Sequence, residues 1–192
     1  IETLAGFIEA NVDNKQKIKV NMGTPSIDPN SIPTYYTVGS SGIPQKTLKL
    51  NGNNHISVAV GMGNPHLIVF VDDLNSINLH KSGKELEHSV DFPKKTNVHF
   101  VKIINDKKIE ILVWERGVGA TNACGTGACA CLVASHLLGY TNSQALISLP
   151  GGNLFINWPN RLSNIYMTGQ ANQVYKGIIP EEIISDLVLQ SD

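Results

Sequence analysis

Short runs of apolar residues, some alternating with polar residues and some continuous, recur along the chain and predict β-strands. Residues 1–12 and 16–22 have this pattern, and the polar turn Asp13-Asn14-Lys15 between them predicts a hairpin. The other predicted strands are residues 46–50, 55–62, 67–71, 98–104, 109–114, 145–149, 154–158, 163–168 and 174–178.

The pattern turns helical between residues 72 and 92, where Asp72 or Asp73 is the expected N-cap. The pair Ser82-Gly83 interrupts this stretch, so we expect two short helices here.

Two more helices are predicted further along the chain. One covers residues 127–138 and ends at Gly139 in the C′ position, and the other covers residues 180–189 with Pro180 at its first position. Many short strands with three separated helices predict an α+β fold built on a curved, mainly antiparallel sheet.

Composition narrows the class of protein. Apolar residues make up 42% of the 192 residues and charged residues 16%, so the chain can bury a core. The net charge of −1 argues against an electrostatic nucleic-acid binder, and no apolar run approaches the ~20 residues of a membrane helix. We therefore expect neither nucleic acid nor membrane as a partner, and a cytoplasmic location.

Residues 23–45 are rich in Pro, Ser, Thr and Gly and are the best candidate for a domain boundary. The chain opens in an alternating pattern with no initiator methionine and no basic signal region, so we expect an N-terminal segment to be missing.

The most informative stretch lies between Trp114 and Leu138. A strand ends near Trp114, a glycine-rich loop follows, and a helix made almost entirely of small or apolar residues begins beside Cys124. A helix that is apolar all round is buried, and its N-terminus lowers the pKa of a thiol from ~8.5 to ~3.5–7.5. We therefore expect a Cys124 thiolate, with Gly125 and Gly127 allowing the same N–H groups to hold a carboxylate.

The three cysteines also admit other interpretations. All three lie between residues 124 and 131 among small apolar neighbours, which favours free thiols in a reducing compartment. Cys124 can be a small buried hydrophobe, and packing is the expected role of Cys129 and Cys131. A shared metal is disfavoured, since Cys124 and Cys129 point ~140° apart and Cys124 and Cys131 lie ~10 Å apart along a helix.

Three further places carry candidate chemistry. A tight turn presents Asn64 and His66 between two strands, although such a histidine is commonly a surface residue. Glu115 and Arg116 precede the glycine loop as either a surface ion pair or a clamp for a zwitterionic amino acid. Asn97 is either a turn residue or a ligand amide.

Several motifs occur in order over most of the chain: Met62-Gly63-Asn64-Pro65-His66, Phe92-Pro93, Thr96-Asn97-Val98, Glu115-Arg116-Gly117, Ala123-Cys124-Gly125-Thr126-Gly127-Ala128-Cys129-Ala130, Pro150-Gly151-Gly152 with Leu154 and Trp158, Met167-Thr168-Gly169 and Val174-Tyr175 with Gly177. With them the chain resembles the diaminopimelate epimerase family. The Cys-Gly-Thr-Gly element alone also occurs in proline-racemase-like enzymes, whereas the Glu-Arg-Gly lead-in and the Gly-Asn-Pro-His turn point to the diaminopimelate branch.

The resemblance implies a fold and a reaction. The family fold has two similar halves, each a sheet rolled around a central helix, with the active site between them. On that template residues 24–169 form the second half, and residues 1–23 and 170–192 belong to the first. The family interconverts LL- and meso-diaminopimelate without a cofactor, with two cysteines on opposite faces of the substrate Cα.

The resemblance also implies residue roles. Cys124 matches one of the two catalytic cysteines, and His66 and Glu115 match the groups that tune the thiols. Tyr175 matches a residue of the family's dimer contact, so a homodimer is implied. The positions that match substrate-holding residues are Asn64, Asn97, Glu115, Arg116, Gly125 and Thr126.

The sequence departs from the family in three places. The family's Cys-Gly-Asn-Gly motif is absent, so we expect these 192 residues alone to be inactive. Ala120-Thr121 stands where the family has Glu-Thr, and residues 180–192 extend beyond its usual ending. The alternatives are another cofactor-free racemase of the same fold, such as a proline-racemase-like enzyme, and a non-catalytic binding module.

Overall fold

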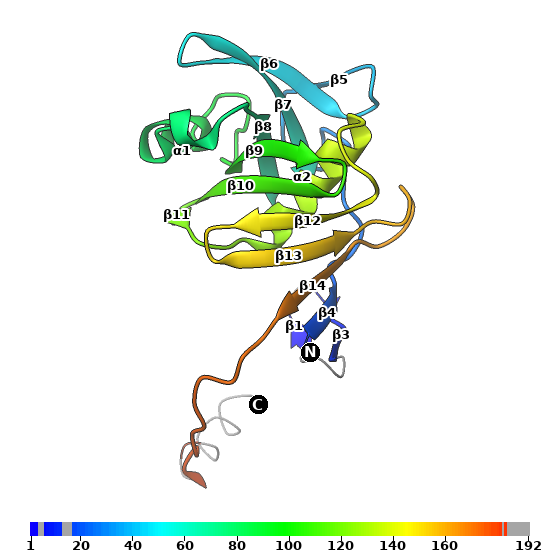
Figure 1. Ribbon diagram of the computed structural model, residues 1–192, viewed down its shortest axis with the longest axis vertical. Helices are drawn as coiled ribbons and strands as arrows, with labels where there is room; N and C mark the ends of the chain where they lie inside the picture. The colour runs from blue at the N-terminus through cyan, green and yellow to red at the C-terminus, as the bar shows by residue number, and fades with distance from the viewer. Residues whose placement is uncertain (4–5, 13–16, 182, 184–192) are drawn as a thin grey trace.

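The computed structural model describes residues 1–3, 6–12, 17–181 and 183. A small two-stranded unit pairs β1 (Glu2–Thr3) with β2 (Gly6–Phe7). Within the described residues, one further sheet contains twelve strands in the order β3-β4-β14-β13-β12-β10-β9-β8-β7-β6-β5, with β11 beside β10 (Figure 1). The strands are β3 (Ala10–Val12), β4 (Lys17–Asn21), β5 (Thr37–Val38), β6 (Pro44–Leu50), β7 (Asn53–Gly61), β8 (Pro65–Phe70), β9 (Asn97–Asn105), β10 (Lys108–Glu115), β11 (Gly119–Thr121), β12 (Gln144–Leu149), β13 (Gly152–Asn157) and β14 (Tyr166–Gln170).

The sheet is mainly antiparallel, as the sequence predicts. Two neighbouring pairs are parallel, β8 with β9 and β10 with β12. The chain reaches each parallel partner through a helix, α1 (Leu79–Glu87) before β9 and α2 (Gly125–Leu137) before β12. These crossovers are the reason why the α+β fold contains parallel strands at all.

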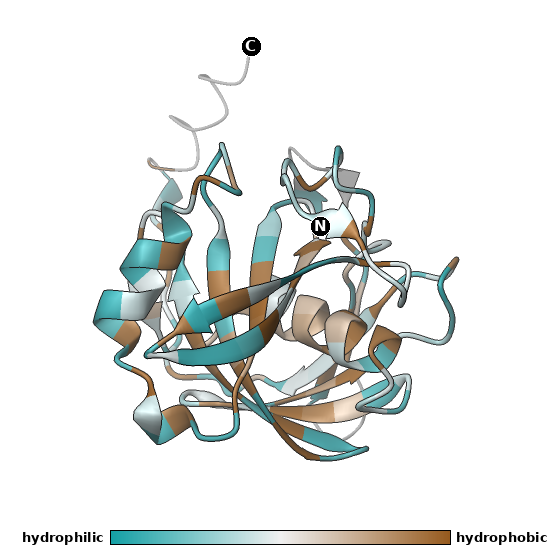
Figure 2. Cartoon of the chain, turned by 90° about the horizontal axis from the view of Figure 1, so that it is seen from above, coloured by the Kyte–Doolittle hydropathy of each residue, from teal (hydrophilic) through white to brown (hydrophobic). Residues whose placement is uncertain are grey.

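The helix α2 lies inside the curve of the sheet and is buried all round from its third to its eleventh residue. Residues 127–135 are all buried, and strands β7, β8, β9, β12, β13 and β14 contact the helix. Figure 2 shows it as a tan to brown helix in the interior, in contrast to the largely teal α1 at the outside. Fully burying a Val or Leu side chain stabilises a fold by roughly 1.5–3 kcal/mol, so Leu132 and Val133 are the largest contributors on this helix.

The strands between the two helices bury both faces. Val101 on β9 faces the core around α2, whereas Val98 and Phe100 face a second core. Trp114 belongs to the second core, against which α1 packs. Strands buried on both sides read as continuous apolar runs, which explains why the sequence marks β8, β9 and β10 so clearly.

Most predicted strands are confirmed to within a few residues, including the pairing of β3 with β4, but some expectations were wrong. Residues 1–12 do not form one strand, because Glu2–Thr3 pairs antiparallel with Gly6–Phe7. Residues 174–178 form no strand and run away from the body of the protein (Figure 1). The short strands β5 and β11 were not predicted. The helix expected at residues 180–189 falls largely outside the described residues.

The break in the first helical region lies elsewhere than predicted. A 3-10 turn, η1 (Leu74–Ser76), is capped by Asp73, and α1 starts anew with Asn78 as its N-cap. Gly83 lies inside α1 because the helix packs closely on Trp114 there: a Cβ at Gly83 would lie 2.6 Å from Trp114 Cγ. The glycine marks a close contact between helix and strand rather than a helix end.

Gly139 takes a positive φ of 77° after α2, as the predicted C′ position requires. Among the described residues, no helix is long and apolar enough to cross a membrane.

The close contact at Gly83 predicts the effect of a substitution. Gly83→Ala adds up to ~1 kcal/mol of helix propensity, but overpacking against the indole costs about 1–3 kcal/mol. We expect a net loss of about 1–2 kcal/mol in the free energy of unfolding, measured by urea denaturation. The control is Lys84→Ala at an exposed position of α1, which should stay within about 0.5 kcal/mol. A stabilised Gly83→Ala chain would contradict the close packing.

Candidate active site

The strand register brings the predicted site residues to one end of the sheet. The parallel pairing of β8 and β9 aligns His66 with Asn97. The antiparallel pairing of β9 and β10 aligns Trp114 with Val98, so Glu115 at the end of β10 reaches the same end of the sheet. The N-terminus of α2 completes the arrangement with Cys124, close enough to Glu115 for the two side chains to interact.

Cys124 is the N-cap of α2, as predicted. Its backbone is extended (φ −147°, ψ 108°), and its Sγ accepts a hydrogen bond from the Gly127 N–H at 3.3 Å. The Thr126 hydroxyl lies 3.5 Å from the same sulfur. The residue is only 7% exposed and packs with the core around α2, while its sulfur lies at the N-terminal end of the helix.

The structure corrects the expected protonation state of Cys124. Burial raises the pKa of this thiol above its ordinary value, and the Glu115 carboxylate raises it further. The Thr126 hydroxyl and the Gly127 N–H act in the opposite direction but do not outweigh burial. The predicted lowering of the pKa by the helix N-terminus was therefore wrong for this chain, and the resting group is a neutral thiol at neutral pH.

Cys129 and Cys131 are fully buried, and burial raises the pKa of both thiols. Both belong to the core around α2, in keeping with their predicted packing role. Within the part of the chain that the structure describes, no group of three or more His, Cys, Asp or Glu side chains could hold a metal ion.

Asn97 uses its side-chain amide to join two loops. Its Nδ2 donates to the Pro65 carbonyl at 3.0 Å, and its Oδ1 accepts from the Arg116 N–H at 3.0 Å. The residue is 4% exposed. The amide therefore holds the turn before β8 and the turn after β10 in a fixed relation.

The Arg116 side chain lies at the rim of a cavity of about 450 Å³. Its guanidinium donates to the Lys94 carbonyl at 3.1 Å, and Lys94 and Asn64 line the same cavity. The other lining residues are Ser26, Asn30, Ser31, Pro33, Gly61, Gly63 and Pro65. Two cationic side chains and an amide suit a ligand that carries a carboxylate.

His66 is fully buried, so the alternative of a surface histidine was wrong. Its Nε2 lies 2.8 Å from Asn64 Oδ1, and its Nδ1 lies 2.8 Å from His99 Nε2. Burial lowers the pKa of His66 well below its ordinary value, and His99 and Arg116 lower it further. His66 is thus a neutral imidazole engaged with Asn64 and His99.

A carboxylate that the sequence analysis missed fixes the turn that carries Arg116. Glu87, at the end of α1, accepts from Trp114 Nε1–H at 2.7 Å and from the Gly117 N–H at 2.9 Å. Burial alone would raise the pKa of Glu87, but these bonds bring it below its ordinary value. No local pattern announces this role, because the two partners lie 27 and 30 residues away along the chain.

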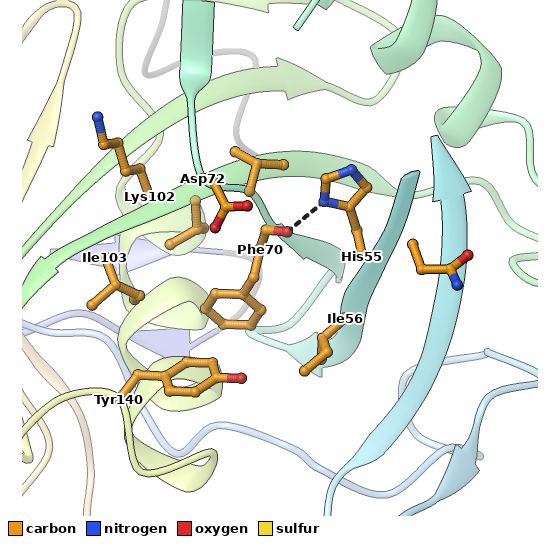
Figure 3. A pocket seen from close by; sticks show the side chains of 10 residues that line it. His55, Ile56, Phe70, Asp72, Lys102, Ile103 and Tyr140 are labelled. Atoms are coloured by element: carbon orange, nitrogen blue, oxygen red, sulfur yellow. Dashed lines mark hydrogen bonds between the residues drawn. The ribbon is translucent and has the colours of Figure 1, made fainter. Parts of the chain in front are cut away.

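Another cavity, of about 430 Å³, contains none of the predicted site residues (Figure 3). It is lined by residues of β7, β8 and β9, by Val71 and Asp72 after β8, and by Tyr140, which follows the C-terminal end of α2. Figure 3 shows the ring of Phe70 beside that of Tyr140, and His55 bonded to the Phe70 carbonyl. Its position beyond the far end of α2 separates this cavity from Cys124.

Tyr175, the predicted dimer residue, is 84% exposed and lies in the segment without helix or strand that follows β14.

Comparison with known proteins places this geometry in a family context. The family model described as diaminopimelate epimerase matches residues 58–174, which is more than half of the chain. A diaminopimelate epimerase of Prochlorococcus marinus (strain MIT 9313) is 51% identical over 93% of this chain and 59% of its own length. One of Carboxydothermus hydrogenoformans is 46% identical over 92% of this chain and 63% of its own length.

The chain therefore spans about three fifths of the length of these curated relatives. Among solved structures, a hydroxyproline epimerase from Agrobacterium vitis superposes with a TM-score of 0.57 at 13% identity, covering 88% of this chain and 56% of that one. A PhzF-family protein of Bacillus anthracis gives a TM-score of 0.53 at 14% identity, covering 88% of this chain and 63% of that one. At such identities the likeness concerns the fold alone, and it supports the predicted epimerase-like architecture.

The raised pKa of Cys124 predicts how the thiol reacts. Iodoacetamide should modify Cys124 slowly at pH 7 and faster as the pH rises towards and beyond 9, because only the thiolate is nucleophilic. Glu115→Gln removes a carboxylate that raises the pKa, so the rate at a given pH should increase. Mass spectrometry after timed alkylation measures both effects.

The control is Cys124→Ala, which should show no modification in the folded state, since Cys129 and Cys131 are fully buried. A Cys124 rate that is already maximal at neutral pH would contradict a raised pKa.

Proposed function

Because the chain belongs to the diaminopimelate epimerase family, we propose that Cys124 is one of the two acid–base groups that move a proton on and off the α-carbon of diaminopimelate. The observation that carries the proposal is the position of this thiol at the N-terminus of a buried helix, beside Glu115. No cofactor is part of the proposed reaction.

The helix start supports the carbanion that such a reaction forms. The N–H groups of Gly125 and Thr126 occupy the first turn, where helix geometry leaves donors without an intrahelical acceptor. A substrate carboxylate held there takes up the charge that develops when the α-proton leaves, and fixed dipoles in a dry site stabilise that charge more than water does. Gly125 and Thr126 then bind the reacting end of the substrate.

The protonation state of Cys124 determines the direction in which it first transfers a proton. A neutral thiol can deliver its proton to the planar carbanion, and the thiolate that remains can take the proton back in the reverse reaction. Glu115, which disfavours the thiolate, and Thr126 and Gly127, which favour it, set the balance between the two states. In this assignment Cys124 is the proton donor when the α-proton leaves from the opposite face.

The group on the opposite face is not another cysteine of these 192 residues. Cys129 and Cys131 are the only others in the sequence, and both are sealed in the core on the body of α2. In this proposal residues 24–169 act as one half of the two-base site, and the second base is neither Cys129 nor Cys131. Tyr175, exposed beyond β14, is available for a contact between copies in a homodimer.

The cavity beside Asn64 and Arg116 suits the other end of the substrate. Diaminopimelate carries a second ammonium and carboxylate group, which proline lacks. Arg116 and Lys94 offer positive charge to the carboxylate, and Asn64 offers an amide. Charge-assisted bonds of this kind contribute more than neutral ones, which favours a substrate with a charged distal end over a small cyclic amino acid.

The decisive variant is Cys124→Ala in the natural full-length protein. We expect Cα hydrogen exchange of LL-diaminopimelate in deuterated water, and formation of the meso isomer, to fall by about 10²- to 10⁴-fold, the range of a lost general acid–base group. The fold should persist, since alanine fits a helix start of small residues. Mass spectrometry and chiral chromatography measure the two rates.

Cys131→Ala is the matched control: it lies on the same helix and should retain activity while losing about 1 kcal/mol of stability from packing. The proposal would be refuted if the Cys124→Ala variant kept the parent rate of Cα hydrogen exchange. It would also be refuted if Cys131→Ala lost as much activity as Cys124→Ala.

The distal cavity predicts substrate selectivity. Arg116→Gln removes a charge-assisted bond worth ~1.5–3 kcal/mol, so KM for diaminopimelate should rise roughly tenfold or more with a smaller change in kcat. Lys102→Gln, on the cavity beyond the far end of α2, should leave KM unchanged. Faster turnover of proline than of diaminopimelate, together with a KM that Arg116→Gln leaves unchanged, would instead indicate a proline-racemase-like enzyme.

A further inference from the structure

Two histidines from neighbouring strands contact each other in the interior behind the candidate active site. His66 on β8 and His99 on β9 are both 0% exposed, with ring centroids 5.1 Å apart and tilted by 33°. The only polar contact between the rings is that of His66 Nδ1 with His99 Nε2, at 2.8 Å. His66 lies in a motif that the sequence makes visible, whereas no local pattern marks His99.

The hydrogen-bond partners determine which nitrogens carry protons. Asn64 Oδ1 can only accept, so His66 Nε2, 2.8 Å away, carries a proton. A neutral imidazole has one N–H, so His66 Nδ1 accepts and His99 Nε2–H donates to it. His99 Nδ1 is then a bare acceptor, and within the described part of the chain it is a buried nitrogen without a partner.

The opposite assignment is less favourable. With the Asn64 amide turned round, each histidine would carry its proton on Nδ1, and His99 Nδ1–H would be a buried donor with no acceptor. Orphaned buried N–H groups are rarer in proteins than unsatisfied acceptors. Burial lowers the pKa of His99 to about 3 and that of His66 well below its ordinary value, so both rings stay neutral in either assignment.

His99 also touches the start of α2. A Cβ at Gly127 would lie 2.2 Å from His99 Cε1 and 2.7 Å from its Nε2, so only glycine allows the ring this close to the helix. The N–H of Gly127 is the group that donates to Cys124 Sγ. A single side chain therefore contacts both the imidazole bonded to Asn64 and the helix turn that holds the thiol.

The position of His99 is one where an apolar residue would be expected. Val101 and Ile103, the next residues of β9 on the same face, pack in the core around α2. A buried polar side chain with an unpartnered nitrogen costs stability there, of order 1–3 kcal/mol, that valine or phenylalanine would avoid. Its retention calls for a role beyond filling space.

We propose that His99 is a positioning residue that fixes His66 as the Nε2–H tautomer facing Asn64 and sets the spacing between the Asn64 turn and the Cys124 end of α2. The catalytic consequence rests on the proposed function. The tautomer does not, and it can be measured on this chain alone.

The first experiment reads the tautomer directly. Long-range ¹H–¹⁵N spectra of the 192-residue chain distinguish protonated from bare ring nitrogens, and a His66→Gln variant assigns the His66 signals. We expect His66 to be the Nε2–H tautomer in the parent chain and in His99→Gln, whose amide nitrogen can donate in place of His99 Nε2. His99→Phe removes the donor, so His66 should lose its single tautomer.

Two results would overturn the assignment: an Nδ1–H tautomer of His66 in the parent chain, or an unchanged Nε2–H tautomer in His99→Phe. Val101→Ala is the matched control, because it weakens the core on the same strand without touching the donor to His66. It should lower the free energy of unfolding and leave the His66 signals in place. His66 signals that change equally in Val101→Ala would mean that general loosening, and not the lost donor, sets the tautomer.

The second experiment measures kcat and KM of the natural full-length protein for diaminopimelate. His99→Phe should lower kcat/KM about tenfold to a hundredfold, the scale of a reacting group displaced by ~1 Å, while His99→Gln recovers most of it. Val101→Ala should retain activity when it is compared with His99→Phe under conditions in which both variants are folded to the same extent. If His99→Phe is as active as Val101→Ala, the positioning role is refuted although the epimerase function stands. If the parent protein itself does not epimerise, the proposed function fails while the tautomer result remains.

Discussion

The constraint on which the rest of the structure depends is the need to cover α2 on all sides. The helix has thirteen residues, carries no formal charge, and buries nine consecutive positions. A rolled sheet can cover such a helix completely, since neighbouring strands contact it one after another around its axis. Once the helix is enclosed, its two ends emerge at opposite ends of the roll, and Cys124 occupies the N-terminal one. The position of the thiol is thus a consequence of core packing.

The loops that carry the candidate site are held by the polar side chains of two buried residues, Asn97 and Glu87. Asn97 joins two loops through both ends of its amide, and Glu87 holds the turn after β10 through Trp114 and Gly117. Each such bond contributes ~1 kcal/mol, but leaving one partner unsatisfied costs about 1–3 kcal/mol. The loops therefore have little freedom to rearrange, and the site is organised before any ligand arrives.

The sequence predicted the parts of this arrangement that have a local signature. The apolar periodicity marked most strands, and the composition of α2 indicated burial and located Cys124 at its start. The predicted helix break at Gly83 was wrong because the glycine is required by close contact with Trp114, 31 residues away. In sequence such a glycine looks the same as one that ends a helix. Residues 174–178 have a strand pattern but no partner strand beside them, and periodicity cannot report a missing neighbour. His99 was missed for a similar reason: only the parallel pairing of β8 with β9 shows that it contacts His66.

The sign of the Cys124 pKa shift is the most instructive disagreement, because two real effects compete. A helix N-terminus favours a thiolate, and the Gly127 N–H and Thr126 hydroxyl do so here. The same enclosure that places the helix end also removes water from the sulfur, and loss of hydration disfavours the charged form. For Cys124, burial is the largest of these contributions, so it decides the sign of the shift. A cysteine that caps a fully enclosed helix should therefore rest as a thiol, and its ionisation must be driven by what binds next to it.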